Sequence, residues 1–160
     1  MPEANGNRIF SSYNSDVTKT RSAIVWGGLA CGVLDLAAAY FVLWQPRGTS
    51  AVTGLQGIAR GLIGAAASRG GIATATLGAA IHFLNAFTAA AVYVFASRVM
   101  RVLTTQPVLC GLLYGVAVYL FMYAFVLRMR FGSVPLTPTG IVIHLFCVGL
   151  PIGLAARYAK

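Results

Sequence analysis

Charge is scarce in this sequence of 160 residues. Charged side chains make up 9% of the chain and hydrophobic side chains 58%, and only three residues are acidic. Soluble domains carry roughly 25% charged residues, which they need to cover a surface that faces water. With a mean hydropathy of +0.78, the composition excludes a water-soluble domain and indicates a membrane protein.

The motifs of common enzymes and metal sites are also missing. The sequence contains no GxSxG, GxxxxGK[ST] or HExxH motif and no dinucleotide-binding fingerprint. Its three cysteines, Cys31, Cys110 and Cys147, lie inside apolar runs and form neither a CxxC pair nor a zinc-ligand spacing. These absences favour a protein that is not an enzyme, in which the cysteines are small packing residues.

The net charge of +9 does not indicate nucleic-acid binding. The basic residues stand in ones and twos between the apolar runs, as they do in membrane proteins, and form no patch. In such positions they meet lipid phosphates and the anionic surface of a leaflet. The expected partners are therefore the lipid bilayer and other membrane subunits or further copies of the chain, and not nucleic acid.

Four apolar segments approach the ~20 residues that are needed to cross ~30 Å of hydrocarbon. They are 22–44, 73–96, 107–127 and 138–156. Trp26 and Trp44 lie near the two ends of the first segment, where interfacial aromatic residues are common. The sequence predicts an all-α membrane protein, a four-transmembrane-helix bundle formed by 22–160, which follows a polar and loosely ordered tail at 1–21.

The link between the first two segments is long and rich in glycine. Within 50–68, apolar residues recur at helical spacing beside a stripe of glycines. This pattern predicts a short interfacial or re-entrant helix between the two spans. One role for it is to gate or to bind an anionic lipid headgroup through Arg60 and the following Arg69. The alternative is a helix that only covers one end of the bundle.

The basic residues flank the spans unevenly. The side that holds both termini has Arg8, Lys19, Arg21, Arg98, Arg101, Arg157 and Lys160. The opposite side has Arg47, Arg60, Arg69, Arg128 and Arg130. Because cytoplasmic loops carry the excess of basic residues, both termini are expected in the cytoplasm.

Small residues mark the faces along which the four helices are expected to pack, since lipid provides no hydrophobic drive between helices. The stripes are Gly28, Gly32, Asp35 and Ala39; Gly78, His82, Asn85 and Ala89; Gly111, Gly115, Tyr119 and Met122; and Gly140, His144, Cys147 and Pro151. Bulky residues off these stripes are expected to face lipid. They are Phe41, Phe83, Phe87, Phe121 and Phe146.

Polar residues fall on the same stripes. A charge in the middle of a lipid-exposed helix costs a few kcal/mol, so Asp35 is expected to point inward and to pair with His82. At ~1.5 Å per residue, both lie about 14 Å from the membrane surface opposite the termini, and His144 lies roughly 9 Å from it. The sequence therefore predicts one buried polar layer, made of Asp35, His82, Asn85, His144 and a tyrosine, Tyr119 or Tyr123.

Four roles suit this layer. As a packing network it makes the protein an accessory or structural subunit of a larger membrane assembly, the role that the sequence favours. As a binding site it serves the transport of a proton, a small solute or a lipid. His82 and His144 as axial ligands suit haem b, and the same two histidines with Asp35 suit non-haem iron or zinc.

Part of the sequence resembles a family of small bacterial four-helix inner-membrane proteins. The similar stretches are LQGIARGLIGAAASRGGIATATLGAAIHFLNAFTAAAVYVFASR at 55–98, PVLCGLLYGVAVYLFM at 107–122 and IHLFCVGLPIGLAAR at 143–157. The resemblance implies a multi-pass protein of a bacterial inner membrane. It implies no activity, substrate or catalytic residue, so the four roles of the polar layer stay open.

Overall fold

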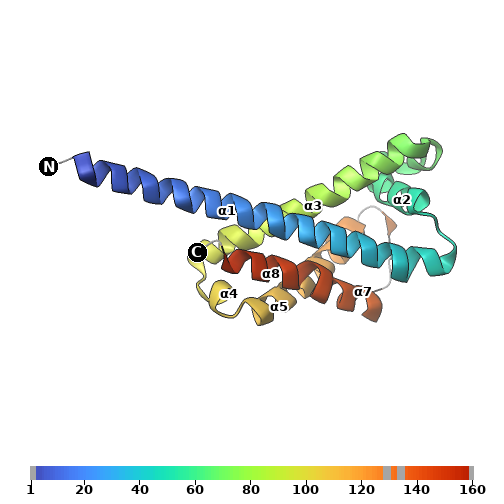
Figure 1. Ribbon diagram of the computed structural model, residues 1–160. Coiled ribbons are helices and arrows are strands. Elements are labelled where there is room, and N and C mark those ends of the chain that lie inside the picture. Colours follow the sequence, from blue (N-terminus) through green and yellow to red (C-terminus); the bar gives the residue numbers. More distant parts are fainter. Residues whose placement is uncertain (1–2, 128–130, 133–135, 159–160) are drawn as a thin grey trace.

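Helices are the only regular secondary structure in the part of the chain that the computed structural model describes, residues 3–127, 131–132 and 136–158. Within these residues, four helices are long and apolar enough to cross a membrane: Asn14–Arg47, Gly71–Val99, Pro107–Ala124 and Pro138–Arg157. The predicted all-α fold is confirmed, with four helices that have the length and hydropathy of membrane spans. Both termini lie at the same end of this multi-pass bundle (Figure 1), as an even number of crossings requires.

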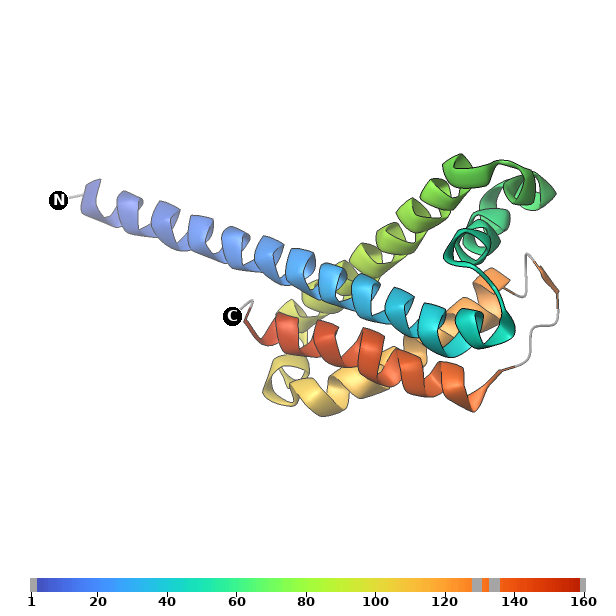
Figure 2. The ribbon, with the colours of Figure 1, turned by 45° about the vertical axis from the view of Figure 1, so that its right-hand side comes forward.

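The first crossing is a helix longer than the membrane. α1 (Glu3–Ala38) continues into a π-helical segment, η1 (Ala39–Trp44), and a 3-10 turn, η2 (Gln45–Arg47). The segment 1–21 was expected to be a loosely ordered tail, but the structure is helical from Glu3 and projects beyond the bundle (Figure 2). Extending an existing helix costs less than nucleating one, and Arg98 of the next crossing donates hydrogen bonds to Asp16 and Thr20 on this extension.

A short helix, α2 (Ala51–Ile63), lies in the link between the first two crossings, within the predicted 50–68. Ser50 caps its first turn by accepting a hydrogen bond from the Thr53 N–H at 3.1 Å. A 3-10 segment, η3 (Gly64–Arg69), then leads back to α3 (Gly71–Val99). Gln56 of α2 donates to the Gly71 carbonyl at 3.0 Å and so ties α2 to the start of α3.

The last two crossings form a hairpin and both are interrupted by π-helical turns. After a single turn, α4 (Val102–Thr105), the third crossing consists of α5 (Pro107–Phe121) and η4 (Met122–Leu127). The fourth consists of α7 (Pro138–Ile143), η5 (His144–Gly149) and α8 (Leu150–Arg157). Arg128, Arg130 and Lys160 lie outside the described residues.

Glycines bring the last two crossings into backbone contact. Gly111 and Gly115 lie on the stripe predicted for the third segment, whereas Gly149 and Gly153 lie off the stripe predicted for the fourth. A Cβ added to Gly115 would collide with the His144 carbonyl, and one added to Gly149 would collide with the Gly111 carbonyl. A Cβ on Gly153 would likewise meet the Pro107 carbonyl. Only glycine permits so close an approach, so α5 is held tightly against η5 and α8 along most of its length.

The contact between α1 and α3 is built differently. Gly28 and Gly32 of α1 form shallow notches that receive the rings of Phe87 and Phe83 from α3. The prediction that these two phenylalanines face lipid is therefore wrong, because a ring fills the space that each glycine leaves. For Phe41, Phe121 and Phe146 the prediction is confirmed, since all three are exposed.

The inward face of α3 is rotated from the predicted one. Its buried residues around the bundle core are Ala86, Ala90, Tyr93 and Val94, whereas Asn85, on the predicted stripe, is exposed. One residue corresponds to 100° around a helix at 3.6 residues per turn, so a shift from Asn85 to Ala86 turns the polar stripe toward the edge of the interface. This rotation matters for the site described below.

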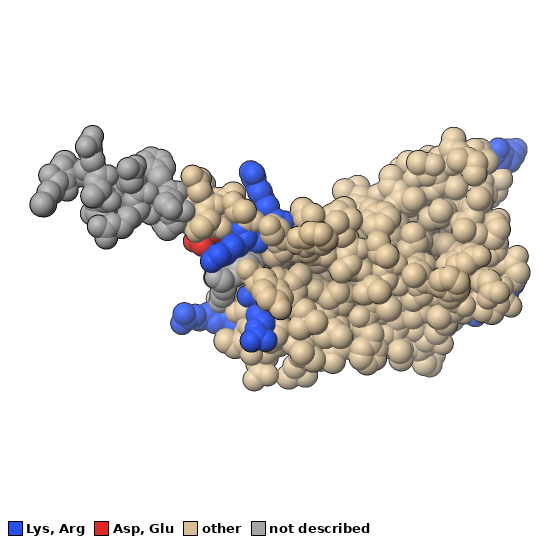
Figure 3. All heavy atoms as spheres, viewed as in Figure 1, with Lys and Arg blue, Asp and Glu red and all other residues tan. Residues whose placement is uncertain are grey.

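The described basic residues gather at the two ends of the bundle. Figure 3 shows lysine and arginine side chains around the end that holds the termini and at the opposite end, with an uncharged belt between them. Such a belt is what the hydrocarbon of a bilayer requires of a surface that faces it.

We expect Gly115→Ala to lower the free energy of unfolding by about 1–3 kcal/mol, because overpacking against a backbone carbonyl cannot be relieved by a rotamer change. The same added methyl group at Gly57 of α2 meets no atom within 4 Å. Gly57→Ala is therefore the matched control and should leave stability unchanged or raise it by up to about 1 kcal/mol. Thermal unfolding in detergent, followed by circular dichroism, measures both, and equal midpoints for the two variants would contradict the packing described here.

Candidate functional site

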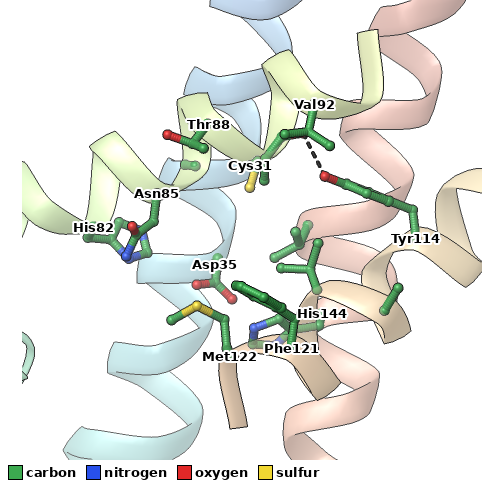
Figure 4. Close-up of a pocket in the computed structure, with 15 residues that line it drawn as sticks. Cys31, Asp35, His82, Asn85, Thr88, Val92, Tyr114, Phe121, Met122 and His144 are labelled. Atoms are coloured by element: carbon green, nitrogen blue, oxygen red, sulfur yellow. Dashed lines mark hydrogen bonds between the residues drawn. The ribbon is translucent and has the colours of Figure 1, made fainter. Parts of the chain in front are cut away.

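A cavity of about 540 Å³ lies between the four crossings. Figure 4 shows its lining, which comes from α1, α3, α5, η4 and η5. The lining residues are Cys31, Asp35, His82, Asn85, Ala86, Thr88, Ala89, Val92, Tyr114, Ala117, Val118, Phe121, Met122, His144 and Val148. Its volume is within the range of small-molecule sites, roughly 300–1,000 Å³.

The cavity exists because α3 and α5 meet at one end and separate toward the other (Figure 2). On the side of the cavity nearer the termini, the Tyr114 hydroxyl of α5 donates to the Ala89 carbonyl of α3 at 2.8 Å. The rings of Tyr114 and Tyr93 lie 5.0 Å apart there. Beyond this junction the two helices diverge, and the cavity fills the space between them.

The mouth of the cavity opens sideways, between α3 and α5. Asn85, Thr88 and Val92 on α3 are exposed although they line the cavity, and so is Phe121 on α5. Asp35 follows Arg21 by 14 residues and precedes Arg47 by 12, which places it about 21 Å and about 18 Å from the two basic residues. The cavity is therefore in the middle of the bundle, and its mouth faces the hydrocarbon.

Four of the predicted site residues line this one cavity: Asp35, His82, Asn85 and His144. The two tyrosines do not line it. Tyr119 is buried behind His144, with ring centroids 4.9 Å apart, and Tyr123 packs against Tyr119 at 4.3 Å. The Tyr119 hydroxyl accepts a hydrogen bond from the Thr137 N–H at 2.8 Å, so this residue holds the start of the fourth crossing in place.

Backbone carbonyls hold both histidine rings. His82 bonds through Nε2 to the Gly32 carbonyl of α1 at 2.9 Å, and His144 bonds through Nδ1 to the Gly140 carbonyl of its own helix at 3.0 Å. A carbonyl oxygen only accepts, so these ring nitrogens carry the protons and the second nitrogen of each neutral ring is an acceptor. No hydrogen bond joins Asp35 to His82 in the described structure, so the predicted central pair is not formed, because Gly32 already binds His82.

Asp35 is partly buried, and in the described part of the chain no hydrogen bond or ion pair reaches its carboxylate. Asn85, across the cavity on α3, likewise makes no hydrogen bond to a described residue. Among the described residues no fully buried side-chain oxygen lacks a partner, so the Asp35 oxygens are open to the cavity. A carboxylate without a partner inside a membrane protein is costly. The cavity thus brings together Asp35, His82, Asn85 and His144 of the predicted polar layer, but none of the other three forms a hydrogen bond with the Asp35 carboxylate.

The two hydroxyl groups in the lining also donate hydrogen bonds to backbone carbonyls. Thr88 donates to the Leu84 carbonyl at 2.7 Å, and Tyr114 donates to the Ala89 carbonyl. Their oxygens remain acceptors toward the cavity. Tyr114 and Phe121 were not predicted as site residues, although they lie on one face of the third crossing at a spacing of seven residues, which could have revealed them.

Two π-helical segments contribute residues to the cavity lining, and a third begins close to it in the sequence. η4 begins at Met122 and η5 at His144, both of which line it, and η1 begins four residues after Asp35. π-helical turns are rare in proteins and frequent at functional sites. Each π-helical turn changes the direction in which later side chains point around the helix axis. A sequence pattern that assumes 3.6 residues per turn does not include this change.

The described residues do not favour a metal or a haem. No three His, Cys, Asp or Glu side chains within them lie close enough together to hold a metal ion, so Asp35, His82 and His144 do not form the metal site considered from the sequence. Of the arginine and tyrosine side chains that could meet the propionates of a haem, the lining contains Tyr114 but no arginine.

The comparisons with known proteins give no relative to reason from. No protein-family model, no curated protein and no solved structure matches the chain. The case for a function therefore depends on the geometry of the cavity.

We expect Asp35→Asn to raise the free energy of unfolding, by at most a few kcal/mol, because it removes an unpaired charge from apolar surroundings. A packing network would give the opposite sign. Tyr119→Phe is the matched control: it also removes one polar group, but one whose hydrogen bonds are made, and should cost about 1 kcal/mol. Thermal unfolding in detergent measures both variants, and a lower midpoint for Asp35→Asn would contradict this account of the site.

Proposed function

We propose that the protein binds a small, largely apolar molecule, which enters the cavity from the bilayer between α3 and α5, and that it stores or carries this molecule in the membrane. The observation that carries the proposal is the unpaired carboxylate of Asp35 in a cavity of about 540 Å³. Polar residues that have no partner within the fold are expected to lower the free energy of unfolding. Proteins retain such residues mainly at functional sites.

This choice follows from the two roles that the sequence leaves foremost. A packing network, as an accessory subunit would use it, needs polar groups that satisfy one another. His82 and His144 bond to backbone carbonyls instead, and Asp35 and Asn85 have no described partner. These contacts favour the binding role that the sequence supports as the alternative.

The apolar part of the lining indicates the character of the ligand. Val92, Val118, Phe121 and Val148 contribute hydrocarbon surface, and polar groups, among them Asp35, make up the smaller part of the lining surface. Ligand sites of this kind bury an apolar body and orient it with a small number of polar contacts. A mouth that faces hydrocarbon selects molecules that are already dissolved in the bilayer.

A bulky side chain in the mouth should block this binding. Ala117 of α5 lines the cavity and is exposed, whereas Ala80 of α3 is exposed but does not line it. We expect native mass spectrometry of protein released from its membrane to show a bound small molecule on the wild type and on Ala80→Trp. Ala117→Trp should lose it. Equal retention by both variants, or no adduct on any of the three proteins, would refute the proposed binding.

We further propose a bacterial inner membrane as the location, with both termini in the cytoplasm. Within the described part of the chain, the end that holds the termini carries Lys19, Arg21, Arg98, Arg101 and Arg157. The opposite end carries Arg47, Arg60 and Arg69. The excess at the first end supports a cytoplasmic position for it.

At the opposite end we propose that α2 lies in the membrane interface. Arg60 and Arg69 are exposed there beside Leu62, Ile63 and Ile72, which are also exposed. A surface of this composition suits the boundary between anionic headgroups and acyl chains. The 29 residues of α3 span about 44 Å, longer than the hydrocarbon, so the start of α3 with α2 packed against it can stand in the headgroup region.

We expect Arg60→Gln combined with Arg69→Gln to reduce binding of phosphatidylglycerol, about fivefold for each charge removed, because each basic residue near an anionic surface contributes about 1 kcal/mol. Arg157→Gln, exposed at the other end, removes one charge from the termini side and serves as the control for general charge loss. Native mass spectrometry in mixed phosphatidylglycerol and phosphatidylcholine micelles counts the bound lipids. An unchanged count in the double variant would show that α2 does not bind headgroups.

A further inference from the structure

The polar groups that face the cavity are almost all hydrogen-bond acceptors. Asp35 offers a carboxylate, and the hydroxyl hydrogens of Thr88 and Tyr114 are already used on the backbone. His82 and His144 each donate one ring N–H to a carbonyl, so the second nitrogen of each neutral ring accepts. Asn85 is the one lining residue whose side chain has amide hydrogens to donate.

The charge of the lining is also one-sided. Asp35 is its only acidic residue, and no lysine or arginine is among the lining residues. The described basic side chains are confined to the two ends of the bundle (Figure 3). A fatty-acid carboxylate or a lipid phosphate would therefore meet a carboxylate and several acceptors without a cation to balance it, which disfavours anionic ligands.

A cation finds several complementary groups here. The carboxylate provides the opposite charge, and Phe121 and Tyr114 provide aromatic surface in the same lining (Figure 4). Aromatic faces attract ammonium groups, most strongly where water is excluded. Hydrogen-bond donors on the cation would also meet the acceptors of Thr88, His82 and His144.

From this arrangement we infer that the ligand is a hydrophobic amine, bound with its ammonium group against Asp35 and its apolar body toward Val118, Phe121 and Val148. The inference rests on the binding function proposed above and specifies its substrate class. It excludes phospholipid amines, since their phosphate would have to enter the same acceptor-rich cavity.

The test uses three probes that share one rigid apolar body: 1-adamantylamine, 1-adamantanol and 1-adamantanecarboxylate. At neutral pH the first is a cation, as a lysine side chain is, the second is neutral and the third is an anion. Binding is measured by equilibrium dialysis of tritiated probe against phosphatidylcholine nanodiscs that hold the protein, with empty nanodiscs to subtract partitioning. The proteins are the wild type, Asp35→Asn, Asp35→Glu and Ala117→Trp.

The wild type should bind the amine at least about thirtyfold more tightly than the alcohol, as expected for a charge pair shielded from water, and should not bind the carboxylate. Asp35→Asn should lose the preference while still binding the alcohol, and Asp35→Glu should retain it, which separates loss of charge from loss of fold. Equal binding of amine and alcohol by the wild type, abolished in Ala117→Trp, would overturn the amine inference and leave the cavity as a binding site. A preference unchanged in Asp35→Asn would overturn the role of Asp35, and binding of none of the three probes would overturn the inference and the proposed function together.

Discussion

The hydrocarbon of a bilayer offers no hydrogen-bond partners, so a polar group inside it must find one within the protein. Most of this protein's intramembrane polar side chains follow that constraint. His82, His144, Thr88 and Tyr114 all bond to backbone carbonyls. Asp35 does not, although an acid is the group for which the constraint is most severe. Asn85, in the same cavity lining, also makes no hydrogen bond to a described residue, and the binding function proposed above accounts for both.

The way the helices are joined explains why that place is hollow. Glycines press α5 onto η5 and α8 through direct backbone contact, and α1 receives the phenylalanines of α3 in its glycine notches. Between α3 and α5, in contrast, Tyr114 forms a cross-link near one end only. The two pairs also meet where α1 packs against η5 and α8. The space between α3 and α5 is what this packing leaves open, and the cavity occupies it.

Much of this architecture follows from the sequence. The four crossings are evident from the length and hydropathy of the apolar runs, and residue depth alone brings Asp35, His82 and His144 to one level. What depth does not provide is the rotation of each helix. Asn85 was placed inward, but the buried residue is Ala86, and the π-helical turns at Met122 and His144 alter the rotation again. The partner of His82 was also missed. It is the backbone carbonyl of Gly32, and because every residue has a carbonyl, a side-chain pattern does not indicate which one accepts the bond.

The helical extension at Glu3–Arg21 was missed for a related reason. Its composition is polar, and polarity in a sequence does not distinguish a disordered tail from a helix propagated outward by the span it joins. The contact of Arg98 with Asp16 and Thr20 shows what composition alone does not, since the two segments are about eighty residues apart along the chain.

The sideways opening between α3 and α5 has a consequence for how the cavity is filled. A molecule that reaches it has already left water, so the concentration that determines occupancy is the one dissolved in the leaflets. For a strongly partitioning solute this concentration far exceeds the aqueous one, and a modest intrinsic affinity is then enough for saturation. Desolvation of the apolar body is completed at the membrane surface before the protein is met. Under the binding function proposed above, the protein adds discrimination, because neighbouring acyl chains compete for the same space and differ from the solute mainly in the group presented to the carboxylate.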